Sequence, residues 1–195
     1  MSTETRASVR SRERNRERTQ KPVGGDRSAQ LRRALEAGAL AVLLGAGVLG
    51  FGPSFGGDPR YLAAGLGGVV LGLLTAAAAL ARRWGPWTVT GAAAGGYLLL
   101  GSALAAPVES AAGVLPTLAS LRVLVLGAVF AWKDLLTVAA PVGTAGGMLV
   151  VPFLLGLLAA LAAGLLCWRA RGAYWPALPV LGLFAAGIAF GTKDV

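Results

Sequence analysis

YLAAGLGGVVLGLLTAAAALA, residues 61–81, contains neither a charged side chain nor a proline. A helix needs about 20 predominantly apolar residues to cross a hydrocarbon core about 30 Å thick, and this stretch meets that requirement. In lipid its backbone N–H and C=O groups must be satisfied within the segment, which an α-helix achieves. The stretch therefore predicts a membrane-spanning helix, and a protein whose fold is shaped by the bilayer.

Four further apolar runs indicate that this helix is one of several. The chain has 195 residues, 55% of them hydrophobic, and its mean hydropathy of +0.67 is too high for a soluble domain of this size. The sequence therefore predicts an all-α, polytopic membrane helix bundle of about five transmembrane helices, which forms a domain over residues 34–195. The expected spans are 34–51, 61–81, 87–106, 146–168 and 173–191.

The first 33 residues differ sharply from the rest, because they hold ten basic and four acidic side chains and lack apolar periodicity. Such a segment buries too little apolar surface to offset its ordering entropy, so we expect residues 1–33 to be a disordered basic tail. The tail has no interleaved aromatic residues on which bases could stack, which argues against nucleic-acid binding. Anionic lipid at the bilayer surface is the partner that its charge favours.

The distribution of basic residues predicts the orientation of the helices. With the tail in the cytoplasm, the inner segments hold fourteen Lys and Arg residues and the outer segments hold four. This asymmetry follows the positive-inside rule, so we expect a multi-pass protein with a cytoplasmic N-terminus. Composition rich in Ala, Gly, Leu, Val and Arg, with one Ile and one Asn, favours a bacterial source and hence the plasma membrane.

The segment 116–138 is predicted to be an external interfacial helix. It is apolar, but too short to be a clear span, and Arg122 lies near its start. Arg122 and Lys133 are eleven residues apart, about three helical turns, so they share one face that can meet water or headgroups. Its other faces are more apolar than a surface helix needs. Shallow re-entry, packing against other helices and a full crossing are the alternatives.

Small residues recur at helical spacing in three pairs, Gly68 with Gly72, Gly91 with Gly95, and Gly187 with Gly191. Small faces let helix backbones approach closely in a membrane. A homodimer seam is one interpretation, and packing within the chain is the one we favour in a sequence with 29 glycines. The oligomeric state stays open.

Residue types that perform chemistry are scarce. The sequence contains no His, and its single cysteine, Cys167, allows neither an intramolecular disulfide nor a Cys/His nucleophile pair. We therefore predict no catalytic residue, no metal site and no cofactor, and a protein that is not itself an enzyme.

Two motifs resemble a known family. AWKDLLTVAAPVG at residues 131–143, followed by MLVVPFL at 148–154, is similar to the N-terminal membrane region of bacterial transglutaminase-like membrane proteins of the TgpA type. In that family an amphipathic stretch ending in such a motif leads through a Pro-containing link into the next helix. The resemblance implies a large extracytoplasmic transglutaminase-like domain with a Cys-His-Asp set, and none of that set can be placed on this chain.

The resemblance implies a membrane-anchoring domain that positions an extracytoplasmic domain outside these 195 residues. The candidate docking or interfacial surface is Arg122, Trp132, Lys133 and Asp134, with the transglutaminase-like domain as a partner beside the lipid bilayer. The alternative is a small transporter or channel subunit, which would need a polar lining through the spans. An enzyme acting on lipid is a further rival, for which the polar residues are too few.

Overall fold

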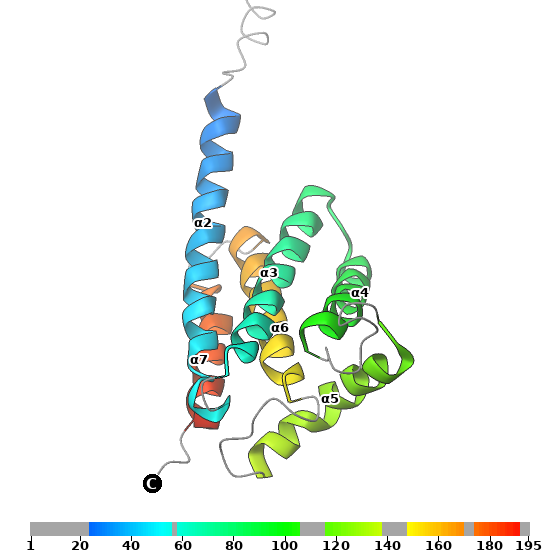
Figure 1. Ribbon diagram of the computed structural model, residues 1–195. Helices are drawn as coiled ribbons and strands as arrows, with labels where there is room; N and C mark the ends of the chain where they lie inside the picture. The colour runs from blue at the N-terminus through cyan, green and yellow to red at the C-terminus, as the bar shows by residue number, and fades with distance from the viewer. Residues whose placement is uncertain (1–23, 56–57, 106–115, 138–147, 170–173, 192–195) are drawn as a thin grey trace, which may run out of the picture. The chain divides into compact units, whose positions relative to one another are not determined.

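The structure is a computed structural model that describes residues 24–55, 58–105, 116–137, 148–169 and 174–191. This part of the chain is helical and contains no strand (Figure 1). In chain order the elements are α2 (Gly24–Leu49), the 3-10 turn η1 (Pro53–Phe55), α3 (Arg60–Ala81), α4 (Pro86–Leu104), α5 (Leu118–Thr137), α6 (Val150–Arg169) and α7 (Ala177–Gly191). The all-α fold class is confirmed.

Contacts divide the chain into two compact units, Met1–Glu36 and Ala37–Val195. In the first unit, α2 begins at Gly24, so residues 24–33 are helical where we expected disorder. An ion pair one turn apart, Arg32 Nε to Glu36 Oε1 at 3.2 Å, supports this turn of the helix. Residues 1–23, the rest of the predicted tail, lie outside the described residues.

Two of the described helices, α3 with 22 residues and α6 with 20, are long and apolar enough to cross a membrane, fewer than the five predicted. The α7 helix begins only after Pro176, and its 15 residues reach about 22 Å. The last 18 residues of α2, enough for a span, include three charged residues, Arg32, Arg33 and Glu36. Helix α4 contains several Thr and Gly residues, which make it less hydrophobic. Length and polarity thus separate these three helices from α3 and α6.

Glycine brings the two apolar helices into backbone contact. A methyl group on Gly68 of α3 would overlap the carbonyl oxygen of Phe153 in α6, and one on Gly72 would lie 2.5 Å from that of Leu157. From the other side, a methyl on Gly156 would lie 2.6 Å from the Gly65 oxygen. The predicted packing within the chain is therefore confirmed for the Gly68 and Gly72 pair, because larger side chains would force the backbones apart.

The other two glycine pairs behave differently. Within the part of the chain that the structure describes, and apart from the local backbone of α4, no atom lies within 4 Å of the position that a Cβ on Gly91 or Gly95 would take. Gly187 in α7 approaches the backbone of Gly50, whereas the surroundings of Gly191 are not described. Helical spacing of small residues therefore predicts a close approach at some positions and open surface at others.

The contacts also establish the directions of the helices in residues 37–195. Pairing of Gly65 with Gly156 and of Ala76 with Gly164 makes α3 and α6 parallel. Helix α4 is antiparallel to α3, because Gly96 meets Leu71 and Leu104 meets Gly67. The apolar ends of α2 and α7 close the arrangement near the start of α3, where Phe51 and Phe190 pair with ring centroids 5.9 Å apart. The N-terminal ends of α3 and α6 thus share one end of the bundle, and their C-terminal ends share the other.

Candidate functional site

Helix α5 matches the predicted interfacial helix closely, since Leu118–Thr137 falls within residues 116–138. Its start is capped by two side chains that exchange hydrogen bonds. The backbone N–H of Ser120 donates to Thr117 Oγ1 at 3.1 Å, and the N–H of Thr117 donates to Ser120 Oγ at 2.9 Å. This reciprocal pattern has the form of a capping box, so the local sequence defines where α5 begins.

The described part of α5 packs against two other helices. The hydroxyl of Tyr97 in α4 donates a buried hydrogen bond of 2.8 Å to the carbonyl oxygen of Leu124. The Leu124 side chain is fully buried and lies over Gly101, while Gly127 faces Val150 at the start of α6. Packing against other helices, one of the alternatives left open by the sequence, is therefore what α5 shows, and it does so at the N-terminal end of α6.

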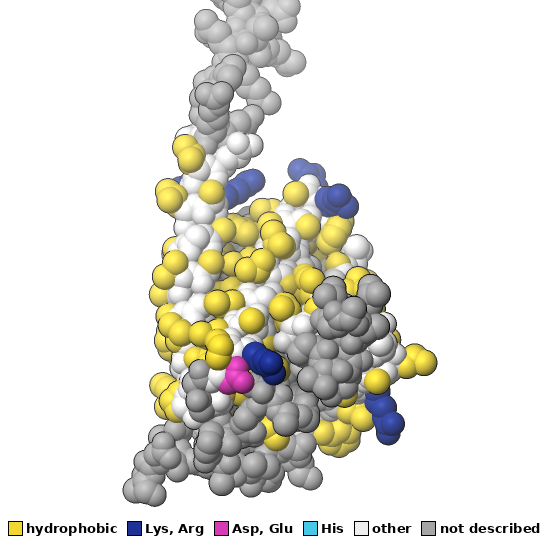
Figure 2. Space-filling model, in the orientation of Figure 1, with side chains coloured by type: hydrophobic (Ala, Val, Ile, Leu, Met, Phe, Trp, Pro, Cys, Tyr) yellow, Lys and Arg dark blue, Asp and Glu magenta, His cyan; other side chains and the backbone are white. Residues whose placement is uncertain are grey.

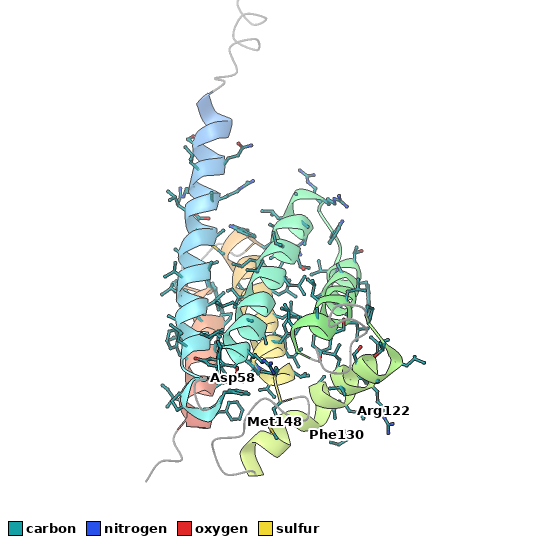
Figure 3. All side chains as sticks on the ribbon, viewed as in Figure 1. Asp58, Arg122, Phe130 and Met148 are labelled. Atoms are coloured by element: carbon teal, nitrogen blue, oxygen red, sulfur yellow. The ribbon has the colours of Figure 1, made fainter. Side chains whose placement is uncertain are left out.

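The four candidate surface residues can be placed only in part. Arg122 is exposed and projects from the first half of α5 (Figure 3). Trp132, Lys133 and Asp134 belong to the same helix, but their side chains lie outside the described residues. The shared polar face of Arg122 and Lys133, and the docking surface as a whole, stay predictions.

An apolar groove that was not anticipated from the sequence lies beside α5. Its volume is about 310 Å³, and it is lined by residues of α5, α6 and α7: Gly127, Ala128, Val151, Leu154, Leu155, Ala186 and Phe190. These residues come from three separate parts of the sequence. No local pattern could have revealed the groove, because it depends on how α7 returns along α6.

The opposite end of the bundle carries a cluster of arginines, which we refer to as the arginine end and define as Arg82, Arg83 and Arg169. Helix α3 finishes in a Schellman turn, in which the N–H of Trp84 bonds the oxygen of Ala79 and the N–H of Arg83 bonds that of Leu80. Arg83 occupies the left-handed position of this turn, with a φ of 51°, where glycine is usual.

Two contacts with Trp84 link Arg82 and Arg169 of the arginine end. Arg169, the last residue of α6, donates from Nη2 to the Trp84 carbonyl oxygen at 2.9 Å. The guanidinium carbon of Arg82 lies 5.7 Å from the centroid of the Trp84 ring, within the range of a cation–π contact. In the sequence these arginines indicated only the orientation of the helices. Their contacts bring residues about 85 positions apart into one place.

Buried polar groups in the described residues are mostly satisfied by their own helices. Thr75 donates to the Leu71 oxygen at 2.7 Å, Ser102 to Leu99 at 2.7 Å and Ser120 to Thr117 at 3.0 Å. The Tyr97 hydroxyl bonds to α5 instead, and the buried Nε1 of Trp168 has no hydrogen-bond partner among the described residues. Within the described residues there is also no group of three or more side chains suited to hold a metal ion.

Comparison with protein-family models, with curated proteins and with solved structures gave no match for this chain.

Proposed function

We propose that this chain is a non-catalytic membrane-anchoring module of a bacterial plasma membrane, with its N-terminus in the cytoplasm. The observation that carries the proposal is the α3–α6 pair, two span-length apolar helices in backbone contact through glycine. Large apolar side chains on the outside of this pair, Leu66, Val70, Leu74 and Leu158, are exposed. Lipid tails are the solvent that such faces require, because a continuous apolar face in water is costly.

Helix direction supports a multi-pass arrangement. Parallel α3 and α6 require the chain to return across the bilayer an odd number of times between them. Helix α4 runs antiparallel to α3 and has 19 residues, about 28 Å, so it supplies that return. Helix α5 then stays on the side where α6 begins. With the apolar C-terminal part of α2 and the 15-residue α7 as two further passes, the module crosses five times.

The positive-inside rule then assigns the two ends of the bundle. The arginine end faces the cytoplasm, and the end with α5 and the groove faces outward. In this orientation Arg122 lies outside, together with the end of α7. The outward end is a surface on which an extracytoplasmic domain can dock. The resemblance of residues 131–154 to transglutaminase-like membrane proteins suggests that domain's class.

A transporter or channel function is less well supported than a membrane-anchoring function. Among the described residues, the buried hydroxyls of Thr75, Ser102 and Ser120 donate to carbonyls of the same helix or helix start, and that of Tyr97 donates to the Leu124 carbonyl of α5, so these hydrogens are not directed into a shared polar path. A transporter site would instead need polar groups that converge between helices.

The anchor is tested by fusing a phosphatase reporter, active only outside the cytoplasm, after Val195 and, separately, after Gly85. We expect the first fusion to be active and to stay in the membrane pellet after alkaline carbonate washing, and the second to be membrane-bound but inactive. A soluble reporter after Val195 would refute membrane anchoring. The reverse pattern of activity would refute the orientation. Addition of the chain to liposomes should leave ion and solute flux unchanged, and a specific flux would favour the transporter alternative.

A further inference from the structure

The arginine end concentrates positive charge that no described carboxylate neutralises. Arg82, Arg83 and Arg169 are all exposed. Among the described side chains of residues 37–195 the one carboxylate is Asp58, at the other end of α3, about 33 Å away along a helix of 22 residues. Figure 2 shows basic side chains at the tip of the α3–α4 turn, and Figure 3 shows Asp58 at the far end of α3.

The three guanidinium groups are held in place to different degrees. Arg169 is tied by its bond to the Trp84 oxygen, and Arg82 lies over the Trp84 ring. The Arg83 guanidinium has no hydrogen bond or ion pair within the described residues, and the backbone of this residue is in a left-handed conformation that costs about 1–2 kcal/mol relative to the right-handed one. The turn therefore presents one free arginine between two that are oriented by Trp84.

We propose that the arginine end is a binding site for the phosphate of an anionic phospholipid headgroup. Guanidinium groups match the geometry of phosphate oxygens, and basic clusters between helices at the cytoplasmic face suit lipid phosphates. Trp84 and Trp87, the latter 88% exposed, supply aromatic rings of the kind that sit at headgroup level. The site rests on the proposed function, since that function brings this end to a bilayer surface.

A lipid is favoured over a free phosphate because the site lies at the ends of apolar helices. Exposed apolar side chains of α3, such as Leu74, continue from the arginine end along the helix. A phospholipid can place its phosphate at Arg83 and its acyl chains along these side chains. A free phosphate would contact only the guanidinium groups of the arginine end and not these apolar side chains.

The test uses the full chain purified in a neutral detergent, with the midpoint of thermal unfolding, Tm, as the readout. Dihexanoyl-phosphatidylglycerol, dihexanoyl-phosphatidylcholine and sn-glycerol 3-phosphate are titrated separately. We expect phosphatidylglycerol alone to raise Tm in a saturable way. The Arg83→Gln variant removes the free guanidinium without breaking a described contact, and it should weaken the apparent affinity about fivefold. Arg122→Gln, the same charge change on an exposed residue of α5, should leave the affinity unchanged.

Each other outcome overturns the site. An equal rise in Tm with glycerol phosphate would mean that the arginines bind a free phosphate and do not require a lipid. Equal weakening in Arg83→Gln and Arg122→Gln would mean that binding depends only on net charge. No effect of phosphatidylglycerol would mean that the arginine end does not bind this headgroup. Since the reporter fusions test membrane anchoring independently, the headgroup site can fail while the anchor stands.

Discussion

Gly72 of α3 lies against the backbone of Leu157 in α6, so close that a methyl group at position 72 would sit 2.5 Å from the Leu157 carbonyl oxygen and 2.8 Å from Cβ of Ala160. Neither obstacle can move easily, because a helix backbone and a Cβ have no rotamers. The two apolar helices of span length, α3 and α6, therefore fit against each other at positions where only glycine has room.

Replacing Gly72 by leucine should destabilise the bundle strongly. The new side chain has to push α6 away along much of its length, and overpacking of this kind costs about 3 kcal/mol or more. The free energy of unfolding in detergent, followed by circular dichroism during denaturant titration, measures the loss. Gly91→Leu is the matched control, because no described residue outside the local backbone of α4 comes within 4 Å of its Cβ position. Equal destabilisation by both changes would contradict the close α3–α6 contact.

The hydrogen bond from Tyr97 to the Leu124 oxygen should contribute measurably to the attachment of α5. Tyr97→Phe removes only the hydroxyl and should lower the free energy of unfolding by about 1 kcal/mol, the usual net value of such a bond. Tyr174→Phe, at a side chain that is 74% exposed, makes the same chemical change and should have no effect. If the two variants unfold alike, the bond does not hold α5 to α4.

Substitution at Arg83 should separate backbone strain from charge. Arg83→Gly relieves the left-handed conformation and should raise the free energy of unfolding by about 1 kcal/mol, whereas Arg82→Gly, at a φ of −97°, should lower it. The same Arg83→Gly variant should bind phosphatidylglycerol more weakly than the unaltered chain. Higher stability together with undiminished binding would remove Arg83 from the headgroup site.

The proposed membrane topology predicts which introduced cysteines react from outside the cell. In a Cys167→Ala background, cysteines at Asp58 and Thr117 should react with a membrane-impermeant maleimide on intact cells, since both lie near the end of the bundle where α5 packs. A cysteine at Gly85, beside the arginine end, should react only after the membrane is opened. Labelling of position 117 only after opening would mean that α4 does not return across the membrane as proposed.

Several features were predictable from sequence because they depend on neighbouring residues only. The uninterrupted apolar stretch at residues 61–81 predicted α3 to within one residue. The start of α5 follows from the Thr117 and Ser120 pair, and its extent was anticipated closely. The predicted helix boundaries were wrong where a polar segment nevertheless has a high helical propensity. Helix α2 begins ten residues before the predicted apolar run, because polar residues such as Arg32 and Glu36 also form a good helix through their pairing.

Which helices touch, and at which glycines, was decided only by the tertiary structure. Lipid tails are as apolar as leucine, so no hydrophobic force selects a partner for an apolar helix face. The partner of a helix face is therefore determined by how well one backbone surface fits another. Spacing in the sequence does not show this fit, since by spacing Gly91 and Gly95 are equivalent to Gly68 and Gly72. The groove beside α5 and the bond from Arg169 to Trp84 have the same origin, since both require segments distant in sequence to meet. Sequence determined that the chain forms apolar helices with basic residues at their ends, and close packing of particular helices brought those ends together.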